Sequence, residues 1–457
     1  MQYNSKNAPL NFHDAHQDFL QGQDTPSAYL ERCLKVIEQR EPEVKAWVYI
    51  NKEQARAAAE EATIRYKENR PLSAIDGMPV GIKDIIETKD MPTQYGSAAY
   101  EGYTTNRDSA IVRALREAGA IILGKTVTTA FALLDPGPTT NPHDEKRTPG
   151  GSSSGSAAAV AAGMVPVTIG TQVIASVLRP SSYCGVWALK PTVGAFNRAE
   201  GLEFSQSHHG IHASSEIDLW NVASEVGLRM GGDPGYPGLY CERGYMPQPN
   251  KPTRLAVLQT EGWPRVEEPA RQAFLDTVEK LSNEGVAMVG RDDDPAIEEL
   301  EEAISSAIQL SLDITAWEHR WMMENLAENH PDAIGKFLTL HIDNARSQTL
   351  EKYRANLKRR ADARRKLQVL QQSYDGLITL SATGIAPIRS EIENTRFPTG
   401  DLSMSCPASL LGAPSYNIPA LELQGMPLGI QLIGQHDWDE RILGYARWIN
   451  ECLTKQA

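Results

Sequence analysis

The pattern of apolar and polar positions changes along the 457 residues and divides the chain into segments of different character. Residues 26–44 predict a helix, because Thr25 can cap it and Pro26 suits the first helical position. Residues 54–70 are rich in strong helix formers and predict a second helix. The chain is therefore expected to begin with a helical part, residues 1–70.

Beyond this part, short apolar runs alternate with amphipathic segments. Residues 75–84 predict a turn that leads into a strand, and Lys83 stands where that strand should end. An amphipathic helix over 109–119 and a buried strand over 120–126 follow. This alternation is typical of an α/β fold with a mainly parallel sheet and helices on its faces. Later strands are predicted at 254–260, 286–290, 376–382 and 427–434, and later helices at 267–285 and 439–453.

Residues 148–192 form the most unusual stretch of the chain. A loop of Gly, Ser, Thr and Pro is followed by an Ala-rich helical run, then by an apolar run that ends at an isolated Ser176. A second apolar run ends at Leu189–Thr192. Glycine permits backbone conformations that other residues avoid, and serine supplies hydroxyl groups. A loop of this kind at the head of a helix is typical of a binding or catalytic site.

The remaining segments set the domain organisation. Residues 193–253 are expected to be loop-rich, with many Gly and Pro around 231–250. Residues 295–374 have a helical and polar pattern, with Trp317 and Trp321 expected on a buried face. No linker separates two parts, so we expect one domain. Its predicted parts are N-terminal helices (1–70), a core (71–294), a helical excursion (295–374) and a C-terminal part of the core (375–457), within a single domain of residues 1–457.

Composition and charge argue against some classes of function. The net charge of −13 disfavours binding to nucleic acids or anionic membranes, because phosphates would be repelled. The basic run Lys352–Lys366 is a local exception; it predicts the solvated face of a helix, with a nucleic-acid patch as the lesser alternative. No apolar run is long enough to span a membrane, and the N-terminus lacks the pattern of a signal peptide. Five scattered cysteines, an odd number, favour a reducing, cytoplasmic compartment.

Three familiar sites do not fit the Gly- and Ser-rich loop. A phosphate-binding loop needs a lysine after its glycines, but alanines follow Gly155–Ser156. The spacing of a dinucleotide fingerprint is absent. Residues 151–155 (GSSSG) match a nucleophile elbow by letter, yet no strand is predicted to run into Ser153 and no histidine partner is convincing.

The histidines of the chain cluster once, at His208, His209 and His212. A metal site would need carboxylates or thiolates nearby, and the spacing offers none. We therefore expect a polar loop near a pocket at this cluster, and neither a metal nor a cofactor.

A serine nucleophile can also be activated by a lysine base. The lysine must then be neutral, because an ammonium cannot accept a proton. Burial lowers the pKa of a lysine, and the positive end of a helix lowers it further. Lys83 is a candidate, since it ends an apolar strand and the helix predicted near Ser156 could point at it. The alternative for any single lysine is a solvated surface residue.

Four motifs stand in a fixed order along the chain: GMPVGIKD (77–84), TPGGSSSGSAAAVAAG (148–163), GTQVIASVLRP (170–180) and YCGVWALKPT (183–192). They carry a resemblance that covers nearly the whole chain. Together they closely resemble the amidase signature family, and this implies a large twisted mixed β-sheet flanked by helices on both faces. The C-terminal segments PTGD (398–401), LLGAPSYNIPA (410–420) and GMPLGIQLIG (425–434) are similar to the last part of that family.

The resemblance implies a Ser–cis-Ser–Lys triad. The family's lysine corresponds to Lys83, its bridging serine after a cis peptide bond to Ser152, and its nucleophile to Ser176. The spacings between these three residues agree with the family pattern. The implied oxyanion hole consists of the backbone N–H groups of Val173, Ile174, Ala175 and Ser176.

Other residues receive supporting roles from the same resemblance. Ser153 is expected to hydrogen-bond Lys83, and Gln172 to support the nucleophile. Substrate contacts are implied for Gly151, Ile174 and Arg179. Arg179 could orient a substrate carboxylate, or it could tie loops together.

One departure from the family falls on the implied oxyanion hole. The family usually has small residues, mostly glycine, just before the nucleophile, whereas this chain has Ile174 and Ala175. A β-branched residue cannot easily adopt a positive φ. If the backbone of the family is kept, these side chains would narrow the acyl pocket or make it more apolar. Two hypotheses follow: a site adapted to an apolar or aromatic substrate, or a weakened oxyanion hole.

The leading hypothesis is a serine hydrolase that cleaves the C–N bond of a small-molecule amide through an acyl-enzyme. Within the family the chain resembles the biuret and nylon-oligomer amidases and the urethanases, so an anilide or a carbamate is a credible substrate. We expect no nucleic-acid or membrane partner, and a monomer or a homodimer. The pocket is expected to be shaped by residues 129–138, 199–213, 313–321 and 398–406.

Two other functions stay open. The glutaminase-like subunit of a tRNA-dependent amidotransferase is one, although the Asp usual in those subunits is Gln172 in this chain. A binding module without catalysis is the other, and the presence of Lys83, Ser152 and Ser176 argues against it.

Overall fold

The computed structural model describes residues 11–198 and 204–454, and one eleven-stranded sheet runs through it in the order β1-β3-β2-β4-β6-β5-β10-β11-β9-β7-β8. β2 is parallel to β3 and β4, and β7 is parallel to β8 and β9, but the other neighbours are antiparallel. The mainly parallel sheet predicted from the alternation is therefore wrong, and the sheet is mixed. The strands are β1 (Trp47–Ile50), β2 (Pro79–Lys83), β3 (Ile121–Thr126), β4 (Val167–Gln172), β5 (Trp187–Lys190), β6 (His208–Ala213), β7 (Arg254–Val257), β8 (Ala287–Val289), β9 (Gly376–Leu380), β10 (Ser415–Leu423) and β11 (Met426–Ile433).

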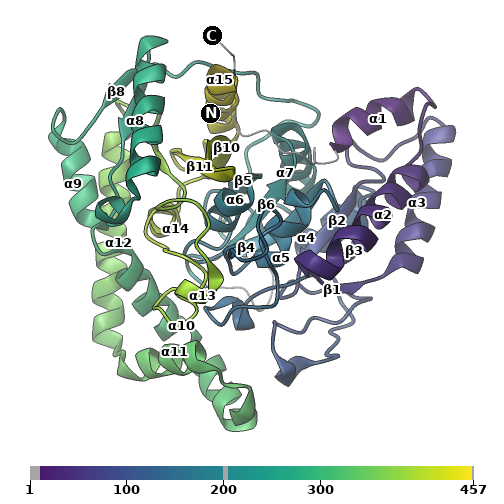
Figure 1. Ribbon diagram of the computed structural model, residues 1–457, viewed down its shortest axis with the longest axis horizontal. Coiled ribbons are helices and arrows are strands. Elements are labelled where there is room, and N and C mark those ends of the chain that lie inside the picture. Colours follow the sequence, from purple (N-terminus) through teal and green to yellow (C-terminus); the bar gives the residue numbers. More distant parts are fainter. Residues whose placement is uncertain (1–10, 199–203, 455–457) are drawn as a thin grey trace.

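Helices cover both faces of the sheet, and alternate strand residues face opposite cores. In β3, Ile122 belongs to the apolar cluster built with α4, α7, α8 and α15, whereas Ile121 and Leu123 belong to the cluster built with α2, α3 and α5. In Figure 1 the purple helices α1–α3 lie at one end of the sheet and the green helices α9–α12 at the other. The helices are α1 (Phe12–Leu20), α2 (Pro26–Val44), α3 (Lys52–Lys67), α4 (Ala110–Glu117), α5 (Ser154–Ala161), α6 (Leu178–Cys184), α7 (Glu216–Met230), α8 (Glu268–Asn283), α9 (Pro295–Ile304), α10 (Ala307–Asn329), α11 (Lys336–Ser347), α12 (Leu350–Leu370), α13 (Arg389–Ile392), α14 (Cys406–Leu411) and α15 (Asp439–Thr454).

Local signals in the sequence account for many of these elements. The Thr25 hydroxyl accepts the N–H of Ala28 at 3.2 Å and caps α2, as predicted. The segment 193–253 is loop-rich, as expected, but it also contains β6 and α7, which the sequence reasoning did not identify. The polar sequence of β6 hides a strand that is buried along its whole length, and the Ser215 hydroxyl caps α7 by accepting the N–H of Asp218.

The helices α9–α12 also differ in part from expectation. Trp321 was expected on a buried face but is 67% exposed, because the buried side of α10 carries Ile314, Met323 and Leu326 instead. The basic run lies on α12, and most of its charged side chains are solvated as predicted, although Arg360 is buried.

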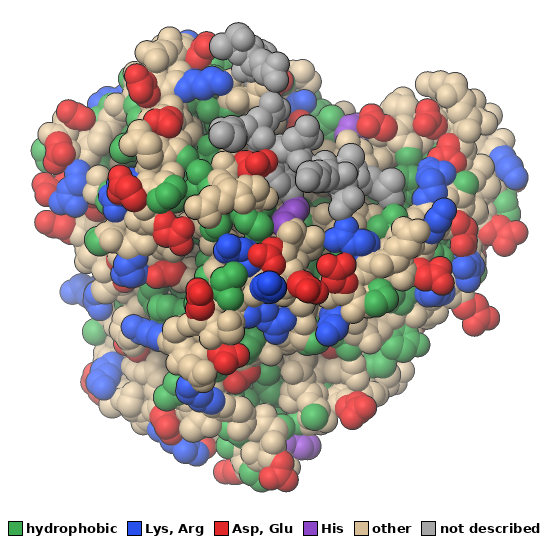
Figure 2. Space-filling view, viewed as in Figure 1, with side chains coloured by type: hydrophobic (Ala, Val, Ile, Leu, Met, Phe, Trp, Pro, Cys, Tyr) green, Lys and Arg blue, Asp and Glu red, His purple; other side chains and the backbone are tan. Residues whose placement is uncertain are grey.

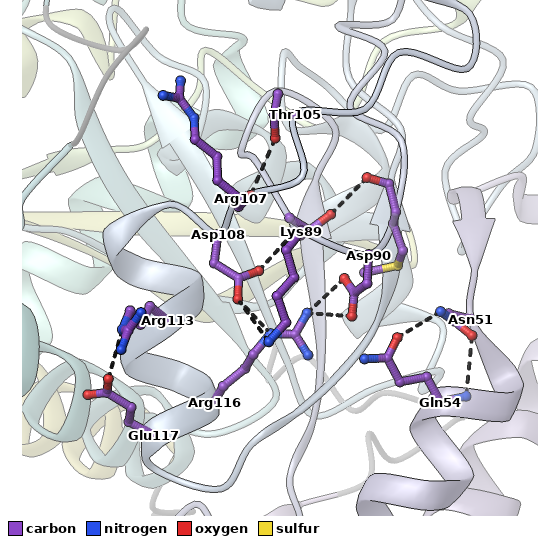
Figure 3. A network of polar contacts seen from close by, with 12 residues as sticks. Asn51, Gln54, Lys89, Asp90, Thr105, Arg107, Asp108, Arg113, Arg116 and Glu117 are labelled. Atoms are coloured by element: carbon purple, nitrogen blue, oxygen red, sulfur yellow. Dashed lines mark hydrogen bonds and ion pairs between the residues drawn. The ribbon is translucent and has the colours of Figure 1, made fainter.

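An ion-pair network fixes the long loop between β2 and α4. This loop also contributes to the cavity described below. Arg116 on α4 binds both oxygens of Asp90 at 2.7 and 2.8 Å, and its Nε lies 3.1 Å from Asp108 (Figure 3). The backbone N–H of Lys89 donates to Asp108 at 2.9 Å. Two points of this loop are therefore held against the same helix.

Charges are spread over the visible surface. Figure 2 shows acidic and basic side chains interspersed across one face of the molecule, with apolar side chains between them. Within residues 11–198 and 204–454, no helix has the length and apolar character needed to cross a membrane.

Candidate active site

The site begins where the central strands β2 and β4 run parallel to each other. Lys83 is the last residue of β2 and is fully buried. Its Nζ lies 2.7 Å from Ser152 Oγ, 2.9 Å from Thr171 Oγ1 and 3.4 Å from the carbonyl oxygen of Thr171. The sequence did not point to Thr171, which stands near the end of β4 beside the lysine.

Burial lowers the pKa of Lys83 well below its usual value. The adjacent carboxylate does not counter this shift, because Asp84 is directed to another buried lysine. Asp84 lies 3.3 Å from Nζ of Lys125, which also donates to Thr93 Oγ1 at 2.6 Å. Lys83 therefore has neutral hydrogen-bonding partners, and this environment favours its uncharged form.

Ser152 is held by an unusual backbone. The peptide bond between Gly151 and Ser152 is cis, as the resemblance implied. Gly150 before it has φ +83°, and a Cβ at that position would meet Cα of Pro180 at 2.8 Å, so only glycine fits. The serine hydroxyl is buried, facing Lys83, just before the first turn of α5.

Ser153 does not have the expected role. It was expected to hydrogen-bond Lys83, but its hydroxyl donates to the carbonyl oxygen of Thr171 at 3.2 Å. The side chain of Ser153 therefore contacts Thr171, a partner of Lys83, and not the lysine itself. It links the Gly- and Ser-rich loop to β4.

The turn that follows β4 presents a row of backbone donors. Among the residues that the structure describes, none accepts a hydrogen bond from the N–H groups of Val173, Ile174, Ala175 or Ser176. Gln172 holds the far side of this turn, since its Oε1 accepts the N–H groups of Val177 at 2.8 Å and Leu178 at 3.0 Å. The turn thus leaves four consecutive amides without a hydrogen-bonding partner in the described chain.

Ser176 lies on this turn, half-buried, and lines a cavity. Its carbonyl oxygen accepts the N–H of Ser153 at 3.4 Å, which brings the two serine-containing loops together. Within the described residues its hydroxyl has no hydrogen-bonding partner, so the contact between Ser176 and Ser152 is not formed in this structure.

The two residues before Ser176, where the family usually has glycine, are accommodated without a left-handed backbone. Neither Ile174 nor Ala175 has a positive φ. Ile174 lines the cavity, as expected, but Ala175 is fully buried in the apolar cluster beneath it. Only the isoleucine therefore makes the pocket more apolar.

Arg179 ties loops together. Its guanidinium donates to the carbonyl oxygens of Gly400 and Gly151, the latter at 2.6 Å, and to Thr399 Oγ1 at 2.9 Å. It is 1% exposed, and burial lowers its pKa to about 10. Although Arg179 borders the cavity, its terminal N–H groups donate to these oxygens and are not available to a substrate carboxylate. Gly151, expected to contact substrate, lies outside the cavity wall and serves Arg179 as an acceptor.

The cavity beside Ser176 has a volume of about 290 Å³ and a mainly apolar wall. Three wall residues have left-handed backbones, which non-glycine residues seldom adopt: Tyr95 (φ 57°), Phe131 (φ 52°) and Ala132 (φ 57°). The N–H of Phe131 donates to the carbonyl oxygen of Tyr95 at 2.8 Å, and their rings stack 6.3 Å apart. The loop fixed by the ion pairs of Figure 3 thereby supplies an aromatic wall.

Parts of this wall follow the predicted pocket loops and parts do not. The predicted segments contribute Phe131, Phe204, His319 and Leu402, while 199–203 lie outside the described residues. Wall residues that the sequence reasoning missed come from the β2–α4 loop, from α11 and from the segment before 398; they include Tyr95, Phe337, Leu340, His341, Asn344, Arg396 and Phe397.

The histidine cluster belongs to the sheet and not to a loop, which corrects the expectation. His208, His209 and His212 are buried in β6, and burial keeps the pKa of each well below its usual value. His212 bonds Ser181 through its Nδ1 at 2.7 Å. Within the described parts of the chain, no three His, Cys, Asp or Glu residues are grouped so that they could hold a metal ion.

Comparison with known proteins decides the family. The model of the amidase family matches residues 28–443. The chain belongs to the amidase family. The chain is 30% identical to a glutamyl-tRNA(Gln) amidotransferase subunit of Chloroflexus aggregans, over 94% of this chain and 93% of that protein.

Solved structures agree with this fold. The peptide amidase of Stenotrophomonas maltophilia superimposes with a TM-score of 0.77 at 25% identity, covering 98% of this chain and 97% of that chain. A 6-aminohexanoate cyclic dimer hydrolase superimposes with a TM-score of 0.83, covering 98% and 97% of the two chains, at 22% identity, which shows the fold alone.

Proposed function

We propose that this protein is a serine hydrolase that cleaves the C–N bond of neutral small-molecule amides, including anilides and carbamates. The observation that carries the proposal is the 2.7 Å hydrogen bond between buried Lys83 and Ser152, on a loop that also bonds the Ser176 turn. A neutral lysine with a hydroxyl partner is the arrangement that a proton relay requires.

The chemistry begins with proton transfer. A neutral amine has two N–H donors and one lone pair, so Lys83 can donate to both oxygens of Thr171 and accept the proton of Ser152. Ser152 in turn accepts the proton of Ser176 when that hydroxyl rotates towards it. The Ser176 oxygen then attacks the substrate carbonyl carbon, and the C–O bond of a tetrahedral intermediate forms.

The free amides of residues 173–176 are suited to the developing oxyanion. Loss of one such donor typically lowers a rate by about 10²–10³-fold. The relay then returns its proton to the leaving nitrogen as the C–N bond breaks, which leaves an acyl-enzyme. A water molecule attacks this ester by the same route in reverse, and the acid and free Ser176 are released.

The cavity supports an uncharged substrate. Its wall contains no Asp or Glu among the described residues, and its two arginines are occupied or peripheral. Arg179 donates to backbone and threonine oxygens, and Arg396 is exposed and donates to Gln309 at 2.9 Å. An apolar acyl or amine group fits this wall better than an ionic one.

A substrate panel tests the proposal. Aliphatic amides, anilides, carbamates and ureides would be incubated with the wild type and with Ser176→Ala, and the released amine measured. Turnover of at least one neutral class, lost in Ser176→Ala, is the expected result. Equal turnover by the two proteins contradicts the proposal.

The relative from Chloroflexus aggregans favours a second candidate, a glutamine-hydrolysing subunit of a tRNA-dependent amidotransferase. Glutamine carries an α-ammonium group, and the described cavity wall offers it no carboxylate. Glutamine should therefore be a poor substrate. Glutamine hydrolysis faster than that of every neutral amide in the panel would favour this second function.

A further inference from the structure

The cavity contains one pair of polar rings within its apolar wall. His319 on α10 and His341 on α11 both line the cavity, and they are 6% and 8% exposed. Nδ1 of His319 lies 3.4 Å from Nε2 of His341. The ring of Phe204 packs edge-on against His319 with centroids 3.9 Å apart. Two helices that are distant in sequence from the catalytic loops therefore bring an imidazole pair to the site.

Burial favours the neutral form of both imidazoles. Burial lowers the pKa of His341 to about 4 and holds the pKa of His319 well below its usual value, where the neighbouring imidazole lowers it further. A neutral imidazole has one N–H donor and one acceptor nitrogen. In the bond between them, one ring must donate and the other must accept.

The two outer nitrogens, Nε2 of His319 and Nδ1 of His341, are then left as one donor and one acceptor. If His319 donates within the pair, its outer nitrogen accepts and that of His341 donates; if His341 donates, the roles reverse. Neither outer nitrogen is hydrogen-bonded to another residue of the described chain. A polar group enclosed by an apolar wall gains most from a partner that the bound ligand supplies.

We propose that His319 and His341 form a specificity subsite that binds a second, uncharged hydrogen-bonding group of the substrate, such as a carbonyl or an N–H, away from the scissile bond. The substrate class is thus a neutral, mainly apolar amide or carbamate with two polar groups separated by an apolar spacer. This inference rests on the proposed function, because it concerns the substrate of the same cavity.

The apolar surroundings favour a neutral group over an ion. Phe337 and Leu340 of α11 and Met322 of α10 also border the cavity, and none can stabilise a charge. A carboxylate bound at the pair would lose its hydration without a cationic partner, whereas a ketone or amide loses less. The pair therefore selects against charged analogues of the same length.

Two substrate series test the subsite. The first consists of p-nitroanilides of hexanoic acid, of keto acids of the same length with the carbonyl at successive carbons, and of dicarboxylic acids of matching length. The second consists of hexanamides whose N-alkyl group is plain, carries a keto group at successive carbons, or ends in a carboxylate. In at least one series the wild type should show kcat/KM about tenfold higher for one keto compound than for the plain compound. The carboxylate analogue should be poorer than both.

Variants assign the preference to the pair. His341→Leu should lower kcat/KM for the keto compound about tenfold more than kcat/KM for the plain compound, which removes the preference, whereas His341→Gln, which keeps a donor and an acceptor, should retain part of the preference. Phe337→Leu is the matched control from the same helix, and it should affect plain and keto compounds alike.

The wild type supplies a result that does not depend on how the variants fold. No preference for any keto compound in either series, or faster turnover of the carboxylate analogue, overturns the subsite while turnover of plain amides still supports the proposed function. An equal loss on both compounds in His341→Leu also overturns it. If the wild type hydrolyses no member of either series, the subsite is overturned, and the proposed function also fails if no neutral amide, carbamate or ureide of the panel is hydrolysed.

Discussion

Gln172 and Ser409 stand 237 positions apart in the chain and are joined by a 2.9 Å hydrogen bond from Nε2 to Oγ. Ser409 donates onward to the carbonyl oxygen of Ile174 at 3.1 Å, while Oε1 of Gln172 accepts the N–H groups of Val177 and Leu178. The Gln172 side chain thus bonds the turn that carries Ser176 directly, through Val177 and Leu178. It also bonds this turn indirectly, through Ser409 of α14. An aspartate at this position could accept the same N–H groups but could not donate to Ser409.

Replacement of Gln172 should therefore displace the turn. Gln172→Leu removes both the acceptor and the donor, and we expect kcat to fall by about 10²-fold with a smaller change in KM, because the amides of 173–176 lose their alignment. Steady-state kinetics on a p-nitroanilide measures this split.

Ser409→Ala is the matched control, because it removes only the outer link. We expect kcat to fall by about fivefold to tenfold, which corresponds to about one hydrogen bond. A loss as large as that in Gln172→Leu, or a Gln172→Leu protein with unchanged kcat, would contradict this account of the turn.

The same substitution should have different effects at the two buried lysines on neighbouring strands: a loss of activity at Lys83 and a loss of stability at Lys125. Lys83 is bonded to neutral oxygens, so Lys83→Met should lower kcat by at least about 10³-fold without lowering the free energy of unfolding. Lys125 is paired with Asp84, so Lys125→Met leaves a buried carboxylate unpaired and should cost about 3–5 kcal/mol of stability. Denaturant unfolding and kinetics of both variants measure the contrast. Greater destabilisation by Lys83→Met than by Lys125→Met would show that Lys83 is charged in the folded protein.

The pH dependence follows from the lowered pKa of Lys83. Below that pKa the amine is protonated and cannot accept a proton, so kcat/KM should rise with pH through it and then level off. The unfolded chain binds the proton up to about pH 10.4, so this lysine makes stability rise with pH between its folded and unfolded pKa values. Lys83→Met should remove this contribution to the pH dependence of unfolding. A kcat/KM that falls as pH rises through neutrality would contradict the role of a neutral base.

Ile174 should set the preference for apolar acyl groups. The side chain borders the cavity next to Ser176, so Ile174→Ala removes apolar contact from the acyl group. We expect the ratio of kcat/KM for hexanoyl over acetyl p-nitroanilide to fall by about tenfold. The acetyl compound is the internal control, since it is too short to need this contact. A gain on both compounds would instead support a site obstructed by the isoleucine.

Much of the site could be predicted because its parts lie in motifs with a fixed order. The strand that ends at Lys83 and the Gly-rich loop with Ser152 are local features, and the structure brings the two side chains within hydrogen-bonding distance. The role of Ser153 could not be predicted in the same way, because neighbouring hydroxyls in one loop differ only in the direction that the backbone gives them.

Other features depend on long-range packing and left little trace in the sequence. β6 reads as a polar loop, since its histidines are buried by neighbouring strands and not by an apolar pattern of their own. Tyr95, His319 and His341 reach the cavity from separate segments whose positions only the fold determines. Ile174 was identified as a departure, but its ordinary backbone became evident only from the structure.

The most direct test of the account is to trap the acyl-enzyme. The enzyme would be mixed with a turned-over p-nitroanilide, quenched during the first turnover, and analysed by intact-protein and peptide mass spectrometry. The account predicts one acyl group per chain, on Ser176, formed together with a burst of p-nitroaniline and absent from Ser176→Ala and Lys83→Met. An acyl group on another residue, or undiminished turnover by Ser176→Ala, would contradict it.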